Sequence, residues 1–125
     1  TIVESEATAL EQAHRLASIE VPLITLDQYV LEKKLEPDLI KIDTEGNEIN
    51  VLAGAKNLLL GKKPFVIFES NTNRSRKEIW NFLDETGYRI NDLPYRKGEM
   101  GSGLTLGRFI NSRNFNFIAV PGRMA

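Results

Sequence analysis

Three carboxylates and a glycine follow a short apolar run in the stretch Asp-Leu-Ile-Lys-Ile-Asp-Thr-Glu-Gly-Asn-Glu, residues 38–48. Asp43 comes directly after residues 39–42, which have the composition of a buried strand. In an α/β sheet, ligands bind in the crevice outside the carboxyl ends of the strands, so we expect a site at Asp43. A carboxylate there can help to hold a divalent cation, orient a substrate hydroxyl or accept its proton, and the residues alone do not rank these roles.

A second apolar run, residues 64–69, also ends in an acid, Glu69, and two amides, Asn71 and Asn73, follow it closely. The segment between the two runs has the spacing of an amphipathic helix. A strand, a helix and a strand joined by the usual right-handed crossover place the two strands parallel. We therefore expect Asp43 and Glu69 to lie at the same edge of the sheet, with the amides beside them.

Some of these charged residues also have a structural explanation. Glutamates in the first turn of a helix satisfy free amide groups and the helix dipole, and we favour this role for Glu48. Gly46 indicates a tight turn or a close approach of the backbone to another group. Lys41 lies inside the predicted strand, where we expect it to pair with a neighbouring carboxylate.

The predicted elements must bring these side chains together. Pro22 restricts the first predicted strand to a sheet edge or to its own first position, Asp27 is expected to cap the helix that follows, and Gly87 ends the last helix. We predict a weak helix or an irregular covering segment over 4–17, a strand over 21–26, a helix over 28–34, a strand over 38–42, a helix over 46–60, a strand over 64–69, a helix over 76–86, a strand over 88–90, a glycine-rich loop over 97–103 and a final strand over 116–121.

Composition narrows the functional class. The 125 residues fit one domain, and 42% apolar and 26% charged content is ordinary for a soluble globular protein. With a pI of about 5.9 and no dense basic stripe, nucleic-acid binding is not indicated. No apolar run approaches the roughly 20 residues that span a bilayer, and no signal peptide is present at the start of the chain. The absence of cysteine fits a reducing compartment, so a cytoplasmic protein is expected.

Two further features bear on ligands. The first 70 residues carry more acids than bases and the remainder the reverse. We favour ordinary solvated surface charge as the explanation, with attraction of an anionic substrate to the carboxyl-terminal half as the alternative. The single histidine, His14, has no partner histidine or cysteine at metal-ligand spacing, and we assign no metal ligand.

Three stretches together resemble the FkbM family of methyltransferases. They are Pro-Asp-Leu-Ile-Lys-Ile-Asp-Thr-Glu-Gly-Asn-Glu at 37–48, Val-Leu-Ala-Gly-Ala at 51–55 and Pro-Phe-Val-Ile-Phe-Glu at 64–69. Thr-Leu-Asp at 25–27 and the carboxyl-terminal strands also suit the family, so the resemblance covers about residues 21–120. It implies an S-adenosylmethionine-dependent O-methyltransferase that acts on a hydroxyl of a sugar or natural product.

The resemblance also implies a class I methyltransferase fold, a seven-stranded doubly wound sheet with an antiparallel last strand. On that template the four strands over 39–42, 64–68, 88–91 and 116–120 are the fourth to the seventh. The glycine-rich turn after the first strand and the acid after the second, which contact the cofactor, have no counterpart in residues 1–20. We therefore expect one partial domain over 1–125, the carboxyl-terminal half of a Rossmann-like sheet, and self-association through an exposed apolar sheet edge.

By the same resemblance Asp43 is the central catalytic residue, with Glu45 and Glu69 as supporting acids. Asp43 and Lys41 are assigned to the cofactor S-adenosylmethionine. Residues assigned to the small-molecule or carbohydrate acceptor are Asn71, Asn73 and Asp27. Two alternatives stay open: a non-catalytic α/β module that binds a carbohydrate or a protein through the sheet edge and its basic half, and a divalent-metal-dependent enzyme using Asp43, Glu69 and Asn71.

Overall fold

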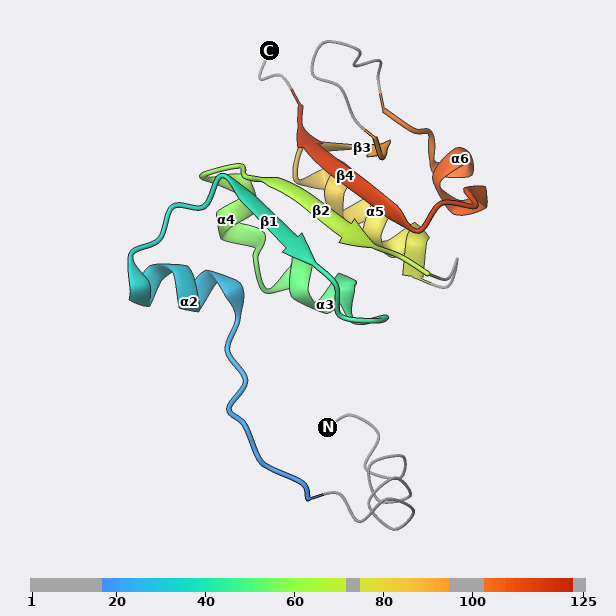
Figure 1. The fold of residues 1–125 in the computed structure, drawn as a ribbon. Helices are drawn as coiled ribbons and strands as arrows, with labels where there is room; N and C mark the ends of the chain where they lie inside the picture. Colours follow the sequence, from blue (N-terminus) through green and yellow to red (C-terminus); the bar gives the residue numbers. More distant parts are fainter. Residues whose placement is uncertain (1–16, 72–74, 95–102, 123–125) are drawn as a thin grey trace.

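A computed structural model describes residues 17–71, 75–94 and 103–122, in which four strands form one mixed sheet (Figure 1). In chain order the elements are α2 (Leu26–Lys33), β1 (Leu39–Ile42), α3 (Glu48–Ala53), α4 (Lys56–Leu60), β2 (Phe65–Glu69), α5 (Arg76–Glu85), β3 (Tyr88–Asp92), α6 (Leu106–Asn111) and β4 (Asn116–Pro121). The predicted mixed α/β class is confirmed.

The strands lie in the order β1-β2-β4-β3. Strands β1 and β2 are parallel, with Ile42 opposite Phe68, and β4 runs antiparallel to both of its neighbours. The predicted parallel pair and the predicted antiparallel last strand are therefore confirmed. A four-stranded sheet of this order agrees with a methyltransferase-like fold.

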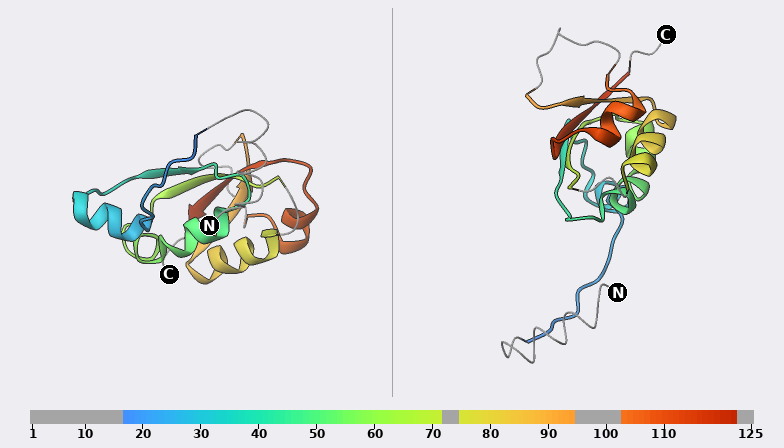
Figure 2. Two further views of the ribbon diagram at one scale, coloured as in Figure 1. Left: turned by 90° about the horizontal axis from the view of Figure 1, so that it is seen from below. Right: turned by 90° about the vertical axis from the view of Figure 1, so that its right-hand side faces the viewer.

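The hydrophobic core lies on one face of the sheet, where alternate strand residues meet the helices. Val66 and Phe68 of β2 are fully buried, while the residues that alternate with them along the strand are partly exposed. They pack with Leu52 of α3, Leu59 of α4 and Ile79 of α5 in one cluster. Figure 2 shows α3, α4 and α5 gathered on this face. This alternation follows from the two-residue repeat of a strand that has one face toward the core.

Helix α6 was not predicted, because six residues give too short a periodic pattern. It begins after Thr105, whose hydroxyl accepts a hydrogen bond from Arg108 N at 3.2 Å. Its Phe109 ring packs edge-on against Phe68 and Phe117, with centroids 6.1 and 4.9 Å away. The short helix therefore completes the core between β2 and β4.

The prediction of one helix over 46–60 is wrong, since α3 and α4 are separate. The chain turns at Gly54, whose carbonyl oxygen accepts a hydrogen bond from Asp27 N at 2.9 Å. A Cβ atom added at Gly54 would lie 3.3 Å from Thr25 Cβ. The close approach of the segment before α2 thus requires a small residue at the break and ends the first helix there.

The predicted strand over 21–26 is also not formed. Residues 17–25 are exposed and form no regular secondary structure. Pro22 lacks the amide that a strand ladder needs, and no described strand pairs with them. Helix α2 begins at Leu26, and its cap is Thr25, whose Oγ1 accepts from Gln28 N at 3.1 Å, in place of the predicted Asp27.

Some predictions fall outside the described ranges. These are His14, Asn73, nearly all of the predicted helix over 4–17 and most of the glycine-rich loop. In the described part of the chain, no helix combines the length and hydrophobicity needed to cross a membrane.

Candidate functional site

The two acidic strand ends are neighbours. Because Ile42 lies opposite Phe68 in the parallel pair, Asp43 and Glu69 are the next residues on adjacent strands. Asp43 is exposed, and Glu69 is partly exposed where β2 pairs with β4. The expectation that both acids lie at one edge of the sheet is confirmed.

A cleft of about 410 Å³ opens beside these strand ends. On one side it is bounded by the turn after β1, and on the other by residues that follow β2. Its lining residues are Glu45, Gly46, Glu48, Ser70, Asn71 and Ser75. The fold thus brings the predicted Glu45 and Asn71 together, whereas Asp43 and Glu69 stand at the strand ends and do not line the cleft.

The turn after β1 has an unusual backbone. Glu45 and Gly46 both adopt positive φ angles, 52° and 106°, which for a residue other than glycine costs about 1 kcal/mol. The carboxylate of Glu48 holds the turn, since its Oε2 accepts hydrogen bonds from Thr44 Oγ1 at 2.7 Å and from Gly46 N at 2.9 Å. Glu48 is buried. As expected, Glu48 has a structural role. The amide that it satisfies belongs to the turn before the helix and not to the first turn of the helix itself.

Ser70 fixes the other side of the cleft. It is buried, its amide donates to Phe115 O at 2.7 Å, and its carbonyl oxygen accepts from Arg76 Nη2 at 2.7 Å. Its hydroxyl also accepts from Arg76 Nε at 3.2 Å. Asn71 follows directly and is exposed. The hydrogen bonds of Ser70 therefore fix the backbone at the residue before Asn71.

Among the described residues near the site, Arg76 makes the most side-chain hydrogen bonds, and no pattern in the sequence indicates this role. Besides Ser70, its guanidinium donates to the carbonyl oxygens of Phe109, Ser112 and Asn114 at 2.8–2.9 Å. It also lies over the Phe109 ring, 5.4 Å from the centroid. Desolvation lowers the pKa of Arg76, and the charge of Asp92 acts in the opposite direction. The buried guanidinium therefore ties the end of β2 to the end of α6.

The comparisons with known proteins give one match. Residues 3–90 match the family model described as the methyltransferase FkbM domain. The chain belongs to the FkbM methyltransferase family. A search of the curated proteins and of the solved structures finds no similar protein. The matched range includes β1, β2 and the turn between Asp43 and Glu48, so the family assignment covers the candidate site.

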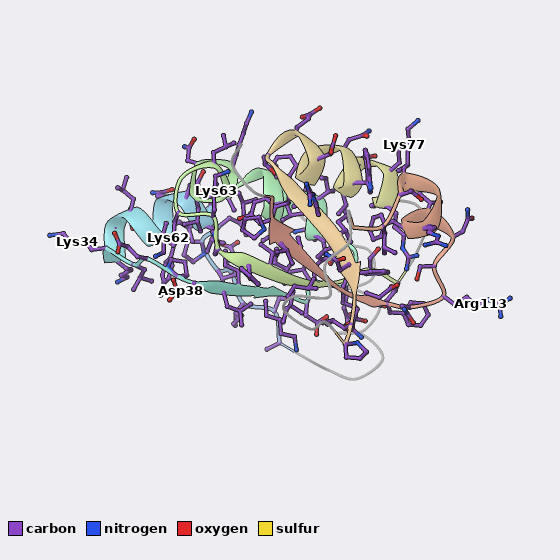
Figure 3. The ribbon with its side chains drawn as sticks, turned by 90° about the horizontal axis from the view of Figure 1, so that it is seen from above. Lys34, Asp38, Lys62, Lys63, Lys77 and Arg113 are labelled. Carbon is purple, nitrogen blue, oxygen red and sulfur yellow. The ribbon has the colours of Figure 1, made fainter. Side chains whose placement is uncertain are left out.

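Among the described residues of this FkbM chain, Lys41 does not have the expected carboxylate partner. It is exposed on β1, on the face away from the helices, because Ile40 and Ile42 take the alternate positions toward the core. The ion pair of the described residues joins Lys62 Nζ and Asp38 Oδ1 at 3.2 Å. Figure 3 shows that pair at the amino end of β1, on the opposite side of the view from Arg113. Within the described ranges no ion pair engages the exposed Lys41 side chain, which leaves it available to a ligand.

Asp27 has a structural task. Its two carboxylate oxygens accept hydrogen bonds from Asn57 N and Leu58 N, both at 2.9 Å, and so cap the amino end of α4. It lines a larger groove of about 960 Å³ beside α2, not the cleft at the strand ends. We place the candidate site at the smaller cleft, because Glu45 and Asn71 meet there. A role of Asp27 in acceptor binding stays a prediction.

The polar groups at the strand ends suit a polar organic ligand. Asp43 carries an exposed carboxylate that no hydrogen bond or ion pair engages within the described ranges. Open space lies beside Gly46, since a Cβ there would meet no atom within 4 Å. Carboxylates of this kind fit the hydroxyl and ammonium groups of S-adenosylmethionine. No three histidine, cysteine or acidic residues of the described ranges are grouped to hold a metal ion. The alternative metal set of Asp43, Glu69 and Asn71 contains only two such residues and stays a prediction.

Proposed function

We propose that this chain carries the acceptor side of an S-adenosylmethionine-dependent O-methyltransferase site, and that the acceptor is a hydroxyl of a sugar or natural product. The observation that carries the proposal is the exposed Asp43 carboxylate at the end of β1, beside the end of β2, in a member of the FkbM methyltransferase family. On this proposal the four strands are the carboxyl-terminal half of a Rossmann-like sheet.

When bound, S-adenosylmethionine supplies a methyl group on a positively charged sulfur. The chain must then position the acceptor oxygen, exclude water and take its proton, which are the main demands of such a transfer. Asp43 accepts the proton of the acceptor hydroxyl as the oxygen bonds to the methyl carbon. The electron pair of the breaking carbon–sulfur bond stays on sulfur, which becomes neutral.

Neighbouring groups would orient the two substrates. Glu45 and Asn71 both line the cleft, where a carboxylate and an amide can hold sugar hydroxyls. Glu69 adds a second acid at the sheet edge, and Lys41 offers a cation to the carboxylate of the methyl donor. The described residues contain no glycine-rich turn between a strand and a helix, so we propose that the remaining donor contacts come from polypeptide outside them.

The test compares Asp43→Asn with the unchanged protein. Methyl transfer from labelled S-adenosylmethionine is measured against a panel of sugars and natural products, using this chain and any longer product of the same gene. Loss of the base should lower turnover by about a hundredfold or more. Asp38→Asn is the matched control, because Asp38 lies at the opposite end of the same strand and its side chain is 91% exposed. Unchanged turnover in Asp43→Asn would remove Asp43 from the mechanism.

The alternative is a non-catalytic module that binds a carbohydrate or a protein through its exposed sheet edge. Leu39 on that edge favours it, since this apolar side chain is exposed. Calorimetric titration with S-adenosylmethionine separates the two functions. Binding to this chain or to the longer product supports the methyltransferase, whereas binding of a carbohydrate without any binding of the methyl donor supports the module.

A further inference from the structure

An exposed aromatic side chain stands beside the candidate cleft. Phe115 is 53% exposed, and it directly precedes β4 in the chain. Its carbonyl oxygen accepts a hydrogen bond from Ser70 N at 2.7 Å. Because Glu69 lies opposite Asn116 in the antiparallel ladder of β2 and β4, this bond continues the ladder by one step and sets Phe115 opposite Ser70. Figure 1 shows the end of β2 and the start of β4 side by side.

Phe115 belongs to the face of the sheet that carries Ser70. Residues that lie opposite each other in an antiparallel pair share a face and stand about 5 Å apart. Phe68 and Phe117 are one such pair, and their rings stack in the core with centroids 5.7 Å apart. Ser70 and Phe115 are the next pair on that face, since every second residue of a strand returns to it. Ser70 lines the cleft, so Phe115 flanks the wall that Ser70 forms.

The position of Phe115 does not depend on the open side of the sheet. Strand β4 is flanked by β2 and β3, so a further strand can join this sheet only beyond β1 or β3. The backbone before Phe115 is also held from inside the protein, because the buried Arg76 donates to Asn114 O at 2.8 Å. The ring is therefore presented next to the cleft from an anchored segment.

The cleft itself is polar. Apart from Gly46, each of its described lining residues carries a carboxylate, an amide or a hydroxyl group. Pockets for small organic ligands are mostly apolar, whereas groups of this kind suit a ligand with many hydroxyls. A sugar ring has hydroxyls around its rim and C–H groups on its two faces. A polar cleft with an aromatic ring at its side offers a partner to both parts of such a ligand.

We propose that Phe115 is the platform on which the acceptor binds, and that the acceptor is a sugar ring. One face of the sugar packs on the phenyl ring, and its C–H groups are thereby removed from water. The hydroxyls at its rim reach Glu45 and Asn71, which are exposed in the cleft. This inference rests on the proposed function and narrows its acceptor to a carbohydrate.

The experiment measures sugar binding separately from methyl transfer. Saturation-transfer NMR titrations with methyl glycosides of hexoses and 6-deoxyhexoses give dissociation constants for this chain and for any longer product of the same gene. Phe115→Leu keeps an apolar side chain but removes the flat ring, and it should weaken binding of the preferred glycoside about tenfold. Phe115→Tyr keeps the ring and should keep the affinity.

The matched control is Leu60→Ala. Leu60 is 46% exposed, comparable to Phe115, but it ends α4 and so lies before the start of β2, at the strand end opposite the cleft. This variant should leave the dissociation constant of the glycoside unchanged. Urea midpoints of all variants show that each remains folded.

The transfer assay gives a second readout. Phe115→Leu should raise the KM for the sugar about tenfold and leave kcat unchanged, because the contact with the ring is the same before and during transfer. The affinity for S-adenosylmethionine should also stay the same. A purely structural role of Phe115 would instead lower the urea midpoint and affect both substrates.

The outcomes separate this inference from the proposed function. Glycoside binding that depends on Phe115, without any methyl transfer, would refute the methyltransferase and leave the sugar platform in place. Methylation of a sugar with an unchanged KM in Phe115→Leu would refute the platform and leave the proposed function. The platform is also overturned if no glycoside binds, if Leu60→Ala weakens binding equally, or if phenols bind through Phe115 and sugars do not.

Discussion

Thr44 Oγ1 donates a hydrogen bond of 2.7 Å to Glu48 Oε2, and this contact closes the turn that carries Glu45 and Gly46. The same oxygen accepts from Gly46 N. A buried carboxylate thus fixes a turn whose backbone lies in the left-handed region at two successive residues. The position of Glu45 in the candidate cleft depends on this fixed acceptor.

Replacing either partner should lower the free energy of unfolding. Hydrogen bonds to a charged group contribute about 1.5–3 kcal/mol, so Glu48→Ala should cost about 3 kcal/mol because it removes two of them. Thr44→Val should cost about 1–2 kcal/mol. Since the two residues share one bond, the double variant should cost less than the sum of the single ones. Urea unfolding followed by circular dichroism gives all three values, and strict additivity would mean that the bond contributes nothing.

Asp27→Ala should destabilise α4 although the residue belongs to α2. The side chain caps two amides at the start of α4, and loss of such a cap costs about 0.5–2 kcal/mol. Asp38→Ala is the control, because its ion pair with Lys62 is exposed and contributes less than about 1 kcal/mol. Thermal unfolding of both variants makes the comparison. An equal, small effect in the two would show that the cap of α4 is dispensable.

The elements with strong apolar periodicity could be predicted from the sequence. Strand β2, Phe65–Glu69, is a continuous apolar run, and α5, Arg76–Glu85, follows a clear helical pattern. Their order predicted a parallel pair of strands, and the parallel pair predicted that Asp43 and Glu69 would meet at one edge. These features depend on local patterns and on the handedness of the crossover.

The rest depends on contacts between residues far apart in the chain. The break at Gly54 follows from its approach to Thr25, and the cap of α4 comes from Asp27, 30 residues upstream of Asn57. Arg76 donates a hydrogen bond to the carbonyl oxygen of Phe109, which lies 33 residues further along the chain. No local pattern contains these pairings, so the sequence predicted which acids stand at the site but not the side chains that hold its walls.

Arg76 should be among the least replaceable residues. Arg76→Met leaves the carbonyl oxygens of Ser70, Phe109 and Ser112 without their buried donor. Because each hydrogen bond from a charged donor contributes about 1.5–3 kcal/mol, the loss of several should lower the free energy of unfolding by at least about 3 kcal/mol. Arg76→Lys keeps the charge but not the planar fork, so it should recover only part of the stability. Urea midpoints report both. A Met variant within about 1 kcal/mol of the unchanged chain would contradict this account.

Tyr88 should make the fold sensitive to alkali. Its buried hydroxyl donates to Pro64 O at 2.7 Å, and desolvation raises the pKa of Tyr88 above its ordinary value. Because the pKa is higher in the folded state, this contribution is complete below about pH 10 and is lost as the pH rises further, by up to about 1.4 kcal/mol per pH unit. Tyr88→Phe should cost about 1 kcal/mol at neutral pH and flatten that decline. The measurement is urea unfolding between pH 8 and 11. The control is Tyr29→Phe, at an exposed tyrosine, which should leave the decline of the free energy of unfolding with pH intact. An undiminished decline in Tyr88→Phe would assign the alkali sensitivity to another group.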